Sequence, residues 1–162
     1  MLRLLGASLL AVVLSVSPIQ VGPCMGLEKP VEGPLLAGFA PTGRFSGHWG
    51  VDWAVPKGTE IRSAGPGTVT FAGSVAGNQA VTVDHGGGLR TSYSYLAGLS
   101  VERGDRVTGS TILGTSGAAH GSAALHFSVR IGDTYLDPLA VVGCRWAAPS
   151  AGLRLVPVRE LK

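Results

Sequence analysis

Short runs of alternating apolar and polar residues, separated by glycine-rich turns, dominate residues 35–142 and constrain the fold most strongly. Six runs of this β type occur, at residues 60–62, 67–72, 80–84, 90–96, 106–107 and 125–130. A period of two is typical of half-buried antiparallel strands. Residues 85–88 read His-Gly-Gly-Gly and supply the positive φ that a hairpin turn requires. The pattern predicts an all-β protein with a compact antiparallel sheet.

The composition agrees with this prediction. The chain has 162 residues, which suffices for one domain with a substantial core but not comfortably for two. Its 25 glycines and 14 % charged residues suit a β protein dense in turns. The net charge of +3 favours an anionic surface such as a cell wall or membrane. Lysine and arginine are scattered without runs, so we expect no nucleic-acid partner.

The ends of the chain differ from its centre. Residues 1–17 combine a positive start, an apolar stretch over 4–16 and small residues at 15–17, which predicts a signal peptide or an N-terminal anchor. The apolar stretch is shorter than the roughly 20 residues of a spanning helix, so no stable membrane insertion is expected beyond an uncleaved signal anchor. We expect a secreted or cell-envelope protein. Residues 18–32 read as a linker, 33–142 as the domain and 143–162 as a C-terminal tail.

Two cysteines flank the predicted domain, Cys24 before it and Cys144 after it. In an exported protein an even pair indicates a disulfide, which here would tie the two ends of the domain together. The alternative is a pair of unlinked small hydrophobic residues. The sequence leaves both readings open.

The stretch GHWGVDWA, residues 47–54, carries the first chemical signal. Its glycines and Val51 make it a poor helix, and in a straight strand His48 and Asp52 would lie about 13 Å apart. Gly50 allows the segment to curve, and the pair could then bind zinc through an imidazole and a carboxylate. His126 alternates with Leu125 and Phe127 and could complete a set of two histidines and one aspartate. A turn and a surface histidine are the alternative, and spacing does not decide.

A family resemblance favours the metal site. Six segments follow the order found in lysostaphin-type zinc metalloendopeptidases, the LytM-like cell-wall hydrolases: GHWGVDWA, GTEIRSAGPGTVTFAG, VTVDHGGGLRTSYSYL, VERGDRVTGSTILGTSG, LHFSVR and YLDP. The resemblance covers roughly residues 33–139. It implies a compact antiparallel β domain, the duplicated hybrid motif, which uses Zn²⁺ to cut peptide cross-links of peptidoglycan. The ligands of the family fall on His48, Asp52 and His126.

The chain departs from the family at two positions. Tyr95 and Ala124 stand where active members carry histidines thought to position the attacking water and stabilise the oxyanion. A zinc ion itself lowers the pKa of water to about 7, so part of the activation would remain. Tyr95 could donate a hydrogen bond to the oxyanion. We expect residues 117–124, which are rich in glycine and alanine, to form a loop that could bring His120 over the metal, and His120 has the pKa range of a general base.

Two functions are compatible with these residues. The first is a secreted zinc metalloendopeptidase acting on peptidoglycan peptides, with His120 and Tyr95 as catalytic residues. The second is a catalytically degenerate relative that binds the cell wall or regulates another wall hydrolase. We expect His85 to have a structural role outside the site, and Trp49 and Trp53 to be packing residues.

Overall fold

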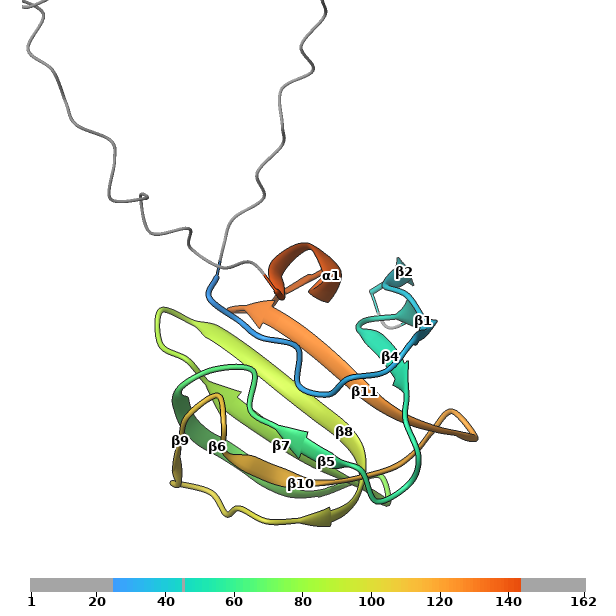
Figure 1. The fold of residues 1–162 in the computed structure, drawn as a ribbon. Coiled ribbons are helices and arrows are strands. Elements are labelled where there is room, and N and C mark those ends of the chain that lie inside the picture. Colours follow the sequence, from blue (N-terminus) through green and yellow to red (C-terminus); the bar gives the residue numbers. More distant parts are fainter. Residues whose placement is uncertain (1–24, 45, 144–162) are drawn as a thin grey trace, which may run out of the picture.

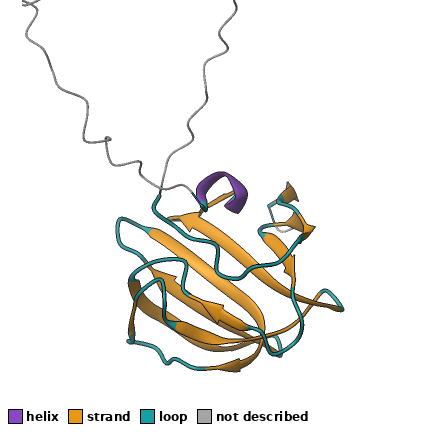
Figure 2. Ribbon diagram, viewed as in Figure 1, coloured by secondary structure: helices purple, strands orange, loops and turns teal. Residues whose placement is uncertain are grey.

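The computed structural model describes residues 25–44 and 46–143, and strands form nearly all of their regular structure (Figure 1, Figure 2). The all-β fold is therefore confirmed. In chain order the elements are β1 (Leu35–Ala37), β2 (Ala40–Gly43), β3 (Ser46–His48), β4 (Val51–Ala54), β5 (Glu60–Arg62), β6 (Gly67–Val75), β7 (Asn78–Asp84), β8 (Leu89–Leu99), β9 (Arg106–Val107), β10 (Ile112–Ala119), β11 (Ser122–Ile131), β12 (Thr134–Leu136) and the one-turn helix α1 (Pro138–Val141).

One folded antiparallel sheet contains ten of the strands. The main path runs β1-β4-β11-β10-β8-β7-β6-β9, with β12 added on β11 and β5 on β10, while β2 and β3 form a separate ladder. The long strand β8 pairs with β11 through its first half and with β10 through its second half. The two partners of β8 therefore diverge, and the sheet folds over (Figure 1).

The core lies inside this fold and fixes the orientation of β4 and β11. Leu125 and Phe127 are fully buried, and the Phe127 ring packs 5.4 Å from Trp53 and 5.3 Å from Tyr93. Burial of each such side chain contributes about 1.5–3 kcal/mol. Because successive strand residues point to opposite faces, this packing turns His126 away from the core. The alternation predicted for His126 is confirmed.

Two of the predicted strands, residues 60–62 and 106–107, have the same bounds in the structure, and the other four are longer than predicted. The prediction of a loop over residues 117–124 is wrong. Strand β10 continues to Ala119 and β11 begins at Ser122, so only His120 and Gly121 form the turn. Glycine and alanine are weak strand formers, and here tertiary pairing with β8 and β11 outweighs that preference.

Both ends of the described domain meet at one place. Leu27 forms a parallel bridge with Val142, and the amide of Gly143 donates to the Leu27 carbonyl at 2.9 Å. Leu27 and Val31 are buried in the core, so the packed unit begins before residue 33. The predicted signal segment, Cys24, Cys144 and nearly all of the tail lie outside the described residues. Within the described part of the chain, no helix has the length and apolar character needed to cross a membrane.

Candidate metal centre

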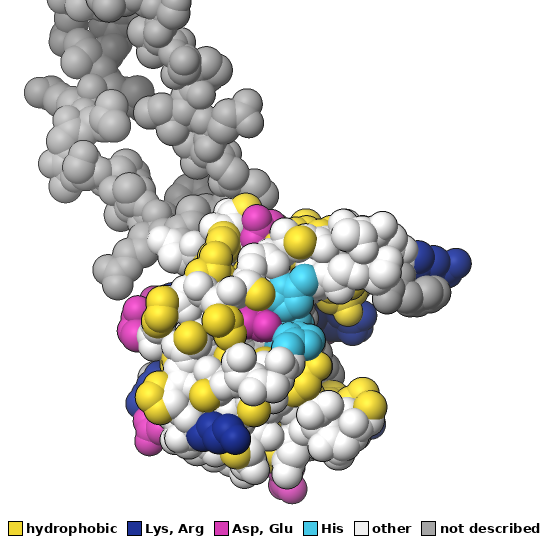
Figure 3. Space-filling model, turned by 90° about the vertical axis from the view of Figure 1, so that its right-hand side faces the viewer, with side chains coloured by type: hydrophobic (Ala, Val, Ile, Leu, Met, Phe, Trp, Pro, Cys, Tyr) yellow, Lys and Arg dark blue, Asp and Glu magenta, His cyan; other side chains and the backbone are white. Residues whose placement is uncertain are grey.

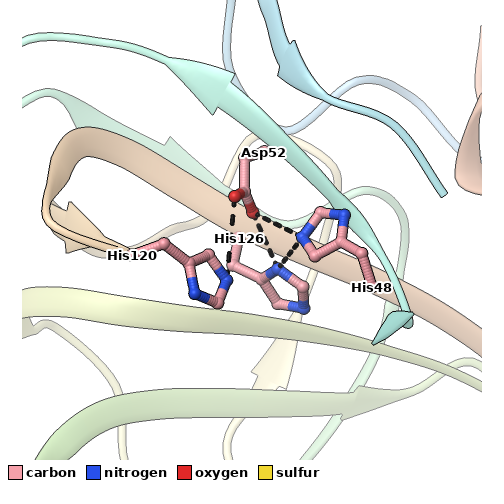
Figure 4. A group of neighbouring side chains, drawn as sticks. All are labelled: His48, Asp52, His120 and His126. Atoms are coloured by element: carbon pink, nitrogen blue, oxygen red, sulfur yellow. Dashed lines mark hydrogen bonds and ion pairs between the residues drawn. The ribbon is translucent and has the colours of Figure 1, made fainter. Parts of the chain in front are cut away.

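Three neighbouring elements bring the predicted ligands together (Figure 4). Asp52 on β4 and His126 on β11 are direct partners across the antiparallel pair. His48 ends β3, and the chain bends through Trp49 and Gly50 before β4 begins. Residues 48 and 52 therefore do not share one straight strand, and the predicted curvature of this segment is confirmed.

Gly50 is the residue that permits the bend. A Cβ atom at this position would lie 2.8 Å from two ring atoms of His126 and 2.4 Å from the Phe127 carbonyl oxygen. Only glycine lets the backbone pass so close to β11. The bend and the position of the His126 ring are therefore coupled.

The donor atoms of the three residues converge. The Nε2 atom of His48 lies 3.1 Å from Asp52 Oδ1 and 3.1 Å from His126 Nδ1, and His126 Nδ1 lies 2.7 Å from Asp52 Oδ1. Tetrahedral zinc, with bonds of about 2.0–2.1 Å, separates its donors by about 3.3 Å. Two imidazole nitrogens and one carboxylate oxygen at this spacing fit a zinc ion after small outward shifts.

A backbone carbonyl outside the cluster sets the orientation of His48. Its Nδ1 atom lies 2.7 Å from the carbonyl oxygen of Gly38, which can only accept a hydrogen bond. Nδ1 must therefore carry the proton, and the neutral ring presents the lone pair of Nε2 to the cluster. Such a partner orients and fixes the tautomer of a metal-ligating histidine.

Asp52 is buried, with only 2 % of its surface exposed. This burial acts to raise the pKa of its carboxyl group, but the hydrogen bond from His126 and the charges of His126, His48 and His120 outweigh it. The pKa of Asp52 is therefore lowered from its usual value. The carboxylate is held in the ionised form that a metal requires.

The β10–β11 turn carries His120 to the same cluster. His120 and Gly121 have φ values of 51° and 85°, as a two-residue type I′ turn requires. The His120 Nε2 atom lies 3.7 Å from Asp52 Oδ2, and 53 % of the side chain is exposed. One donor atom from each of His48, Asp52, His120 and His126 lies within 4.8 Å of the others. His120 thus approaches the second carboxylate oxygen, which the other histidines do not contact.

Tyr95 reaches the cluster through a β-bulge. In the β7–β8 pair, Gln79 is opposite Leu96 and Ala80 is opposite Ser94, so Tyr95 is an extra residue. Its φ of 63° is unusual for a residue other than glycine. The Tyr95 ring lies 5.1 Å from the His120 ring and 6.2 Å from the His126 ring. Bulges re-aim side chains next to active sites, and strained backbone gathers at such sites.

An open groove runs past the cluster. Figure 3 shows histidine side chains around an acidic one on an exposed face of the molecule. A cavity of about 390 Å³ extends from them to the tip of the β6–β7 hairpin; it is lined by Gly47, His48, Trp49, Val75, Ala76, Asn78, Ala80, Ser94, Tyr95, His120 and His126. An extended peptide would therefore have access to the donor atoms.

His85, the fourth histidine, lies elsewhere. Its Nδ1 atom bonds the Pro66 carbonyl at 2.8 Å, and its Nε2 atom lies 2.8 Å from the Thr91 hydroxyl, which bonds the buried Tyr93 hydroxyl at 2.9 Å. Burial lowers the pKa of His85. These contacts support the structural role predicted for it.

Sequence reasoning missed the backbone that supports the site. The acceptor for His48 is a carbonyl of Gly38, and no side-chain pattern marks a carbonyl. The bulge at Tyr95 depends on Gly117, where a Cβ atom would lie 2.5 Å from the Tyr95 carbonyl oxygen. The glycine was visible in the sequence, but its partner strand was not.

An antiparallel β domain with two imidazoles and one carboxylate converging in an open groove has the architecture of a metallopeptidase. The chain belongs to peptidase family M23, which it matches over residues 46–138. This confirms the resemblance to LytM-like peptidases. Enzymes of this family are metal-dependent hydrolases, and the present donor set agrees with that chemistry.

Individual relatives support the assignment. The chain is 37 % identical to an uncharacterized protein of Mycobacterium tuberculosis, over 69 % of this chain and 45 % of the relative. It is 34 % identical to the DD-carboxypeptidase/endopeptidase Mpg of Neisseria gonorrhoeae, over 58 % of this chain and 22 % of Mpg. The chain thus spans less than half the length of either relative.

Solved structures share the fold. Helicobacter pylori Csd3 superposes with a TM-score of 0.67 at 31 % identity, covering 75 % of this chain and 34 % of Csd3. A zinc-containing peptidase from Vibrio cholerae superposes with a TM-score of 0.61 at 27 % identity, covering 69 % of this chain and 39 % of the peptidase. Both are longer proteins that contain a comparable domain.

Proposed function

We propose that this chain is an exported zinc metalloendopeptidase that cleaves peptide cross-links of bacterial peptidoglycan. The observation that carries the proposal is the convergence of His48 Nε2, Asp52 Oδ1 and His126 Nδ1 within 3.1 Å of one another in an open groove. These three residues would hold the zinc ion. When bound, zinc polarises the scissile carbonyl and lowers the pKa of a water molecule.

His120 is assigned as the general base and acid. Its half-exposed ring lies over the groove, and its Nε2 atom is 3.7 Å from Asp52 Oδ2 rather than within the three-atom cluster. From this position the imidazole can take a proton from the attacking water and return it to the leaving amine. Imidazole transfers protons well near neutral pH because its pKa lies close to it.

Tyr95 is assigned as the donor to the oxyanion. A phenol with a pKa of about 10 stays protonated at neutral pH and can donate a hydrogen bond. The bulge places its ring beside those of His120 and His126. A rigidly placed donor in such a position stabilises negative charge that develops on the carbonyl oxygen.

The cell-wall substrate and the export rest on further observations. Mpg of Neisseria, which shares 34 % identity, is named a DD-carboxypeptidase/endopeptidase. The first 17 residues have the pattern of an export signal, and the net charge of +3 favours an anionic wall.

The position of His120 also supports a second candidate function. If His120 were a fourth ligand, zinc would have three histidines and one carboxylate and no open position, as in structural sites. All four donor atoms lie within 4.8 Å of one another, which such a site would need. The chain would then be a catalytically degenerate relative that binds the wall or regulates another hydrolase.

Two variants at position 120 separate these candidates. Asparagine adopts positive φ readily, so His120→Asn keeps the turn and removes the imidazole, whereas His120→Ala also strains the turn. Zinc per chain is measured by native mass spectrometry, and hydrolysis by the release of new amino groups from purified peptidoglycan. For the enzyme, we expect His120→Asn to retain one zinc and lose hydrolysis.

For the degenerate relative, His120→Asn would weaken zinc binding and the unmodified chain would release no amino groups. His126→Ala serves as the control that must lose zinc under both candidates. A chain that binds no zinc before any substitution would contradict the enzyme and the closed four-ligand site, and would leave a binding or scaffold domain without metal.

A further inference from the structure

A second cavity lies next to the metal centre, on the other side of Trp49. It has a volume of about 640 Å³ and is lined by Arg44, Trp49, Arg130, Asp133 and Tyr135. Trp49 follows the ligand His48 directly and lines the metal-site groove as well. A peptide lying in the groove can therefore extend into this cavity.

The charges in the cavity favour an anion. Two guanidinium groups, of Arg44 and Arg130, and one carboxylate, of Asp133, line it. Arg130 is partly buried on β11, yet within the described residues it forms no ion pair, and neither does Asp133. A partly buried guanidinium without a carboxylate partner is a strong site for a planar oxyanion, which it can bind through two parallel hydrogen bonds.

The aromatic side chains of Trp49 and Tyr135 restrict the size and shape of the ligand that the cavity can hold. The Trp49 ring lies 5.4 Å from the Tyr135 ring in an edge-to-face arrangement, and the Trp49 Nε1 atom donates to the Ser46 carbonyl at 3.0 Å. These contacts hold the indole in place, and because Trp49 lines both cavities, the indole can contact the apolar part of a ligand. An amino-acid residue with a small side chain and a free carboxylate fits both the walls and the charges.

We infer that this cavity is a subsite for a free carboxylate of the substrate peptide, with Arg130 as its anion-binding residue. The inference rests on the proposed function for the identity of the peptide. In a wall stem peptide the carboxylate can come from the C-terminal D-alanine or from the α-carboxyl group of D-glutamate, and both present the same chemistry to Arg130.

Three synthetic peptides distinguish the sources. The first is L-alanyl-γ-D-glutamyl-L-lysyl-D-alanyl-D-alanine, the second has a C-terminal amide, and the third has D-isoglutamine in place of D-glutamate. Binding is measured by isothermal titration calorimetry with the zinc-loaded full chain carrying His120→Asn, so that turnover does not interfere. We expect one amidation to weaken binding about tenfold, as loss of a charge-assisted pair does.

Variants of the cavity complete the test. The parent for these variants is the chain that carries His120→Asn. With Arg130→Gln added, it should bind all three peptides equally and weakly, and with Asp133→Asn added, it should bind the first peptide more tightly. Arg103→Gln changes an exposed position before β9 and should leave the affinities of the parent unchanged. Equal affinity of the parent for all three peptides, or discrimination that survives Arg130→Gln, would overturn the inference. If the subsite is present but the unmodified chain hydrolyses no wall peptide, the proposed enzyme fails and the carboxylate subsite stands.

Discussion

Gly117 and Tyr95 touch across β10 and β8 so closely that a Cβ atom on Gly117 would lie 2.5 Å from the Tyr95 carbonyl oxygen. The contact occurs at the bulge where Tyr95 has a φ of 63°. A strand glycine at such a position marks a close approach of two backbones. The bulge, and with it the direction of the Tyr95 ring, depends on this glycine.

Gly117→Ala should therefore displace Tyr95 and destabilise the domain by about 1–3 kcal/mol, as overpacking does. The free energy of unfolding is measured in urea and hydrolysis on purified peptidoglycan. Gly98→Ala, on the strand β8 that also carries Tyr95, is the control, because its Cβ atom would meet only Thr115 Oγ1 at 3.5 Å. If both variants lost the same unfolding free energy and the same hydrolytic activity, the bulge would not require Gly117.

Removal of one hydroxyl tests the role of Tyr95. Tyr95→Phe keeps the ring and the bulge but removes the donor, so kcat should fall about 10²-fold, as it does when one oxyanion donor is lost. KM and the zinc content should stay nearly unchanged. A fall in zinc content would show that the hydroxyl supports the metal ligands instead.

The turn at His120 predicts a conflict between stability and activity. An Asn-Gly pair is strongly preferred in type I′ turns, so His120→Asn should raise the free energy of unfolding, by about 0.5 kcal/mol. The same variant should lose hydrolysis. Chemical denaturation and the peptidoglycan assay measure the two effects. A variant that is less stable than the parent would show that contacts of the imidazole outweigh the backbone preference.

Gly50→Ala should reduce zinc affinity although Gly50 has no side chain. Its Cβ atom would lie 2.8 Å from two atoms of the His126 ring, which must move away. Zinc affinity is measured by competition with a chromogenic chelator. Gly73→Ala is a suitable control, because its nearest neighbour would be a Phe71 ring carbon at 3.4 Å. Unchanged affinity in Gly50→Ala would disprove the coupling of the bend to His126.

His85 should make stability depend on pH. Because burial lowers its pKa, the folded protein binds fewer protons at this residue than the unfolded chain. Its stabilising contribution is therefore complete above the unfolded pKa of about 6.5 and is lost as the pH falls from that value through the lower pKa of the folded protein. The difference in unfolding free energy between the parent and His85→Gln should shrink between pH 7.5 and pH 5. The metal-centre histidines are common to both proteins and cancel in this difference. If the difference in unfolding free energy between the two proteins stayed constant from pH 7.5 to pH 5, the prediction would be contradicted.

The sequence was informative where local rules apply. Alternation located β5, β6, β7, β8, β9 and β11, although four of these strands extend beyond the predicted bounds, and it placed His126 on the face of β11 that points away from Leu125 and Phe127. The resemblance to LytM-like peptidases selected the three ligand positions, and the structure brings their donor atoms together.

Long-range pairing limited the rest. The direct opposition of Asp52 and His126 is a register between strands 74 residues apart, which no local pattern encodes. The glycine-rich half of β10 was missed because its strand conformation depends on close backbone neighbours. No sequence pattern connects Arg44 with Arg130, because only the folded chain shows that they line one cavity.

The pairing of Leu27 with Val142 has a mechanical consequence. Force applied to the two ends of the domain acts first across this junction, where the Gly143 amide is bonded to the Leu27 carbonyl. Until the junction breaks, tension passes from one end to the other without entering β4, β8 or β11. Force applied to the two ends of the domain therefore does not reach the metal ligands before this junction breaks.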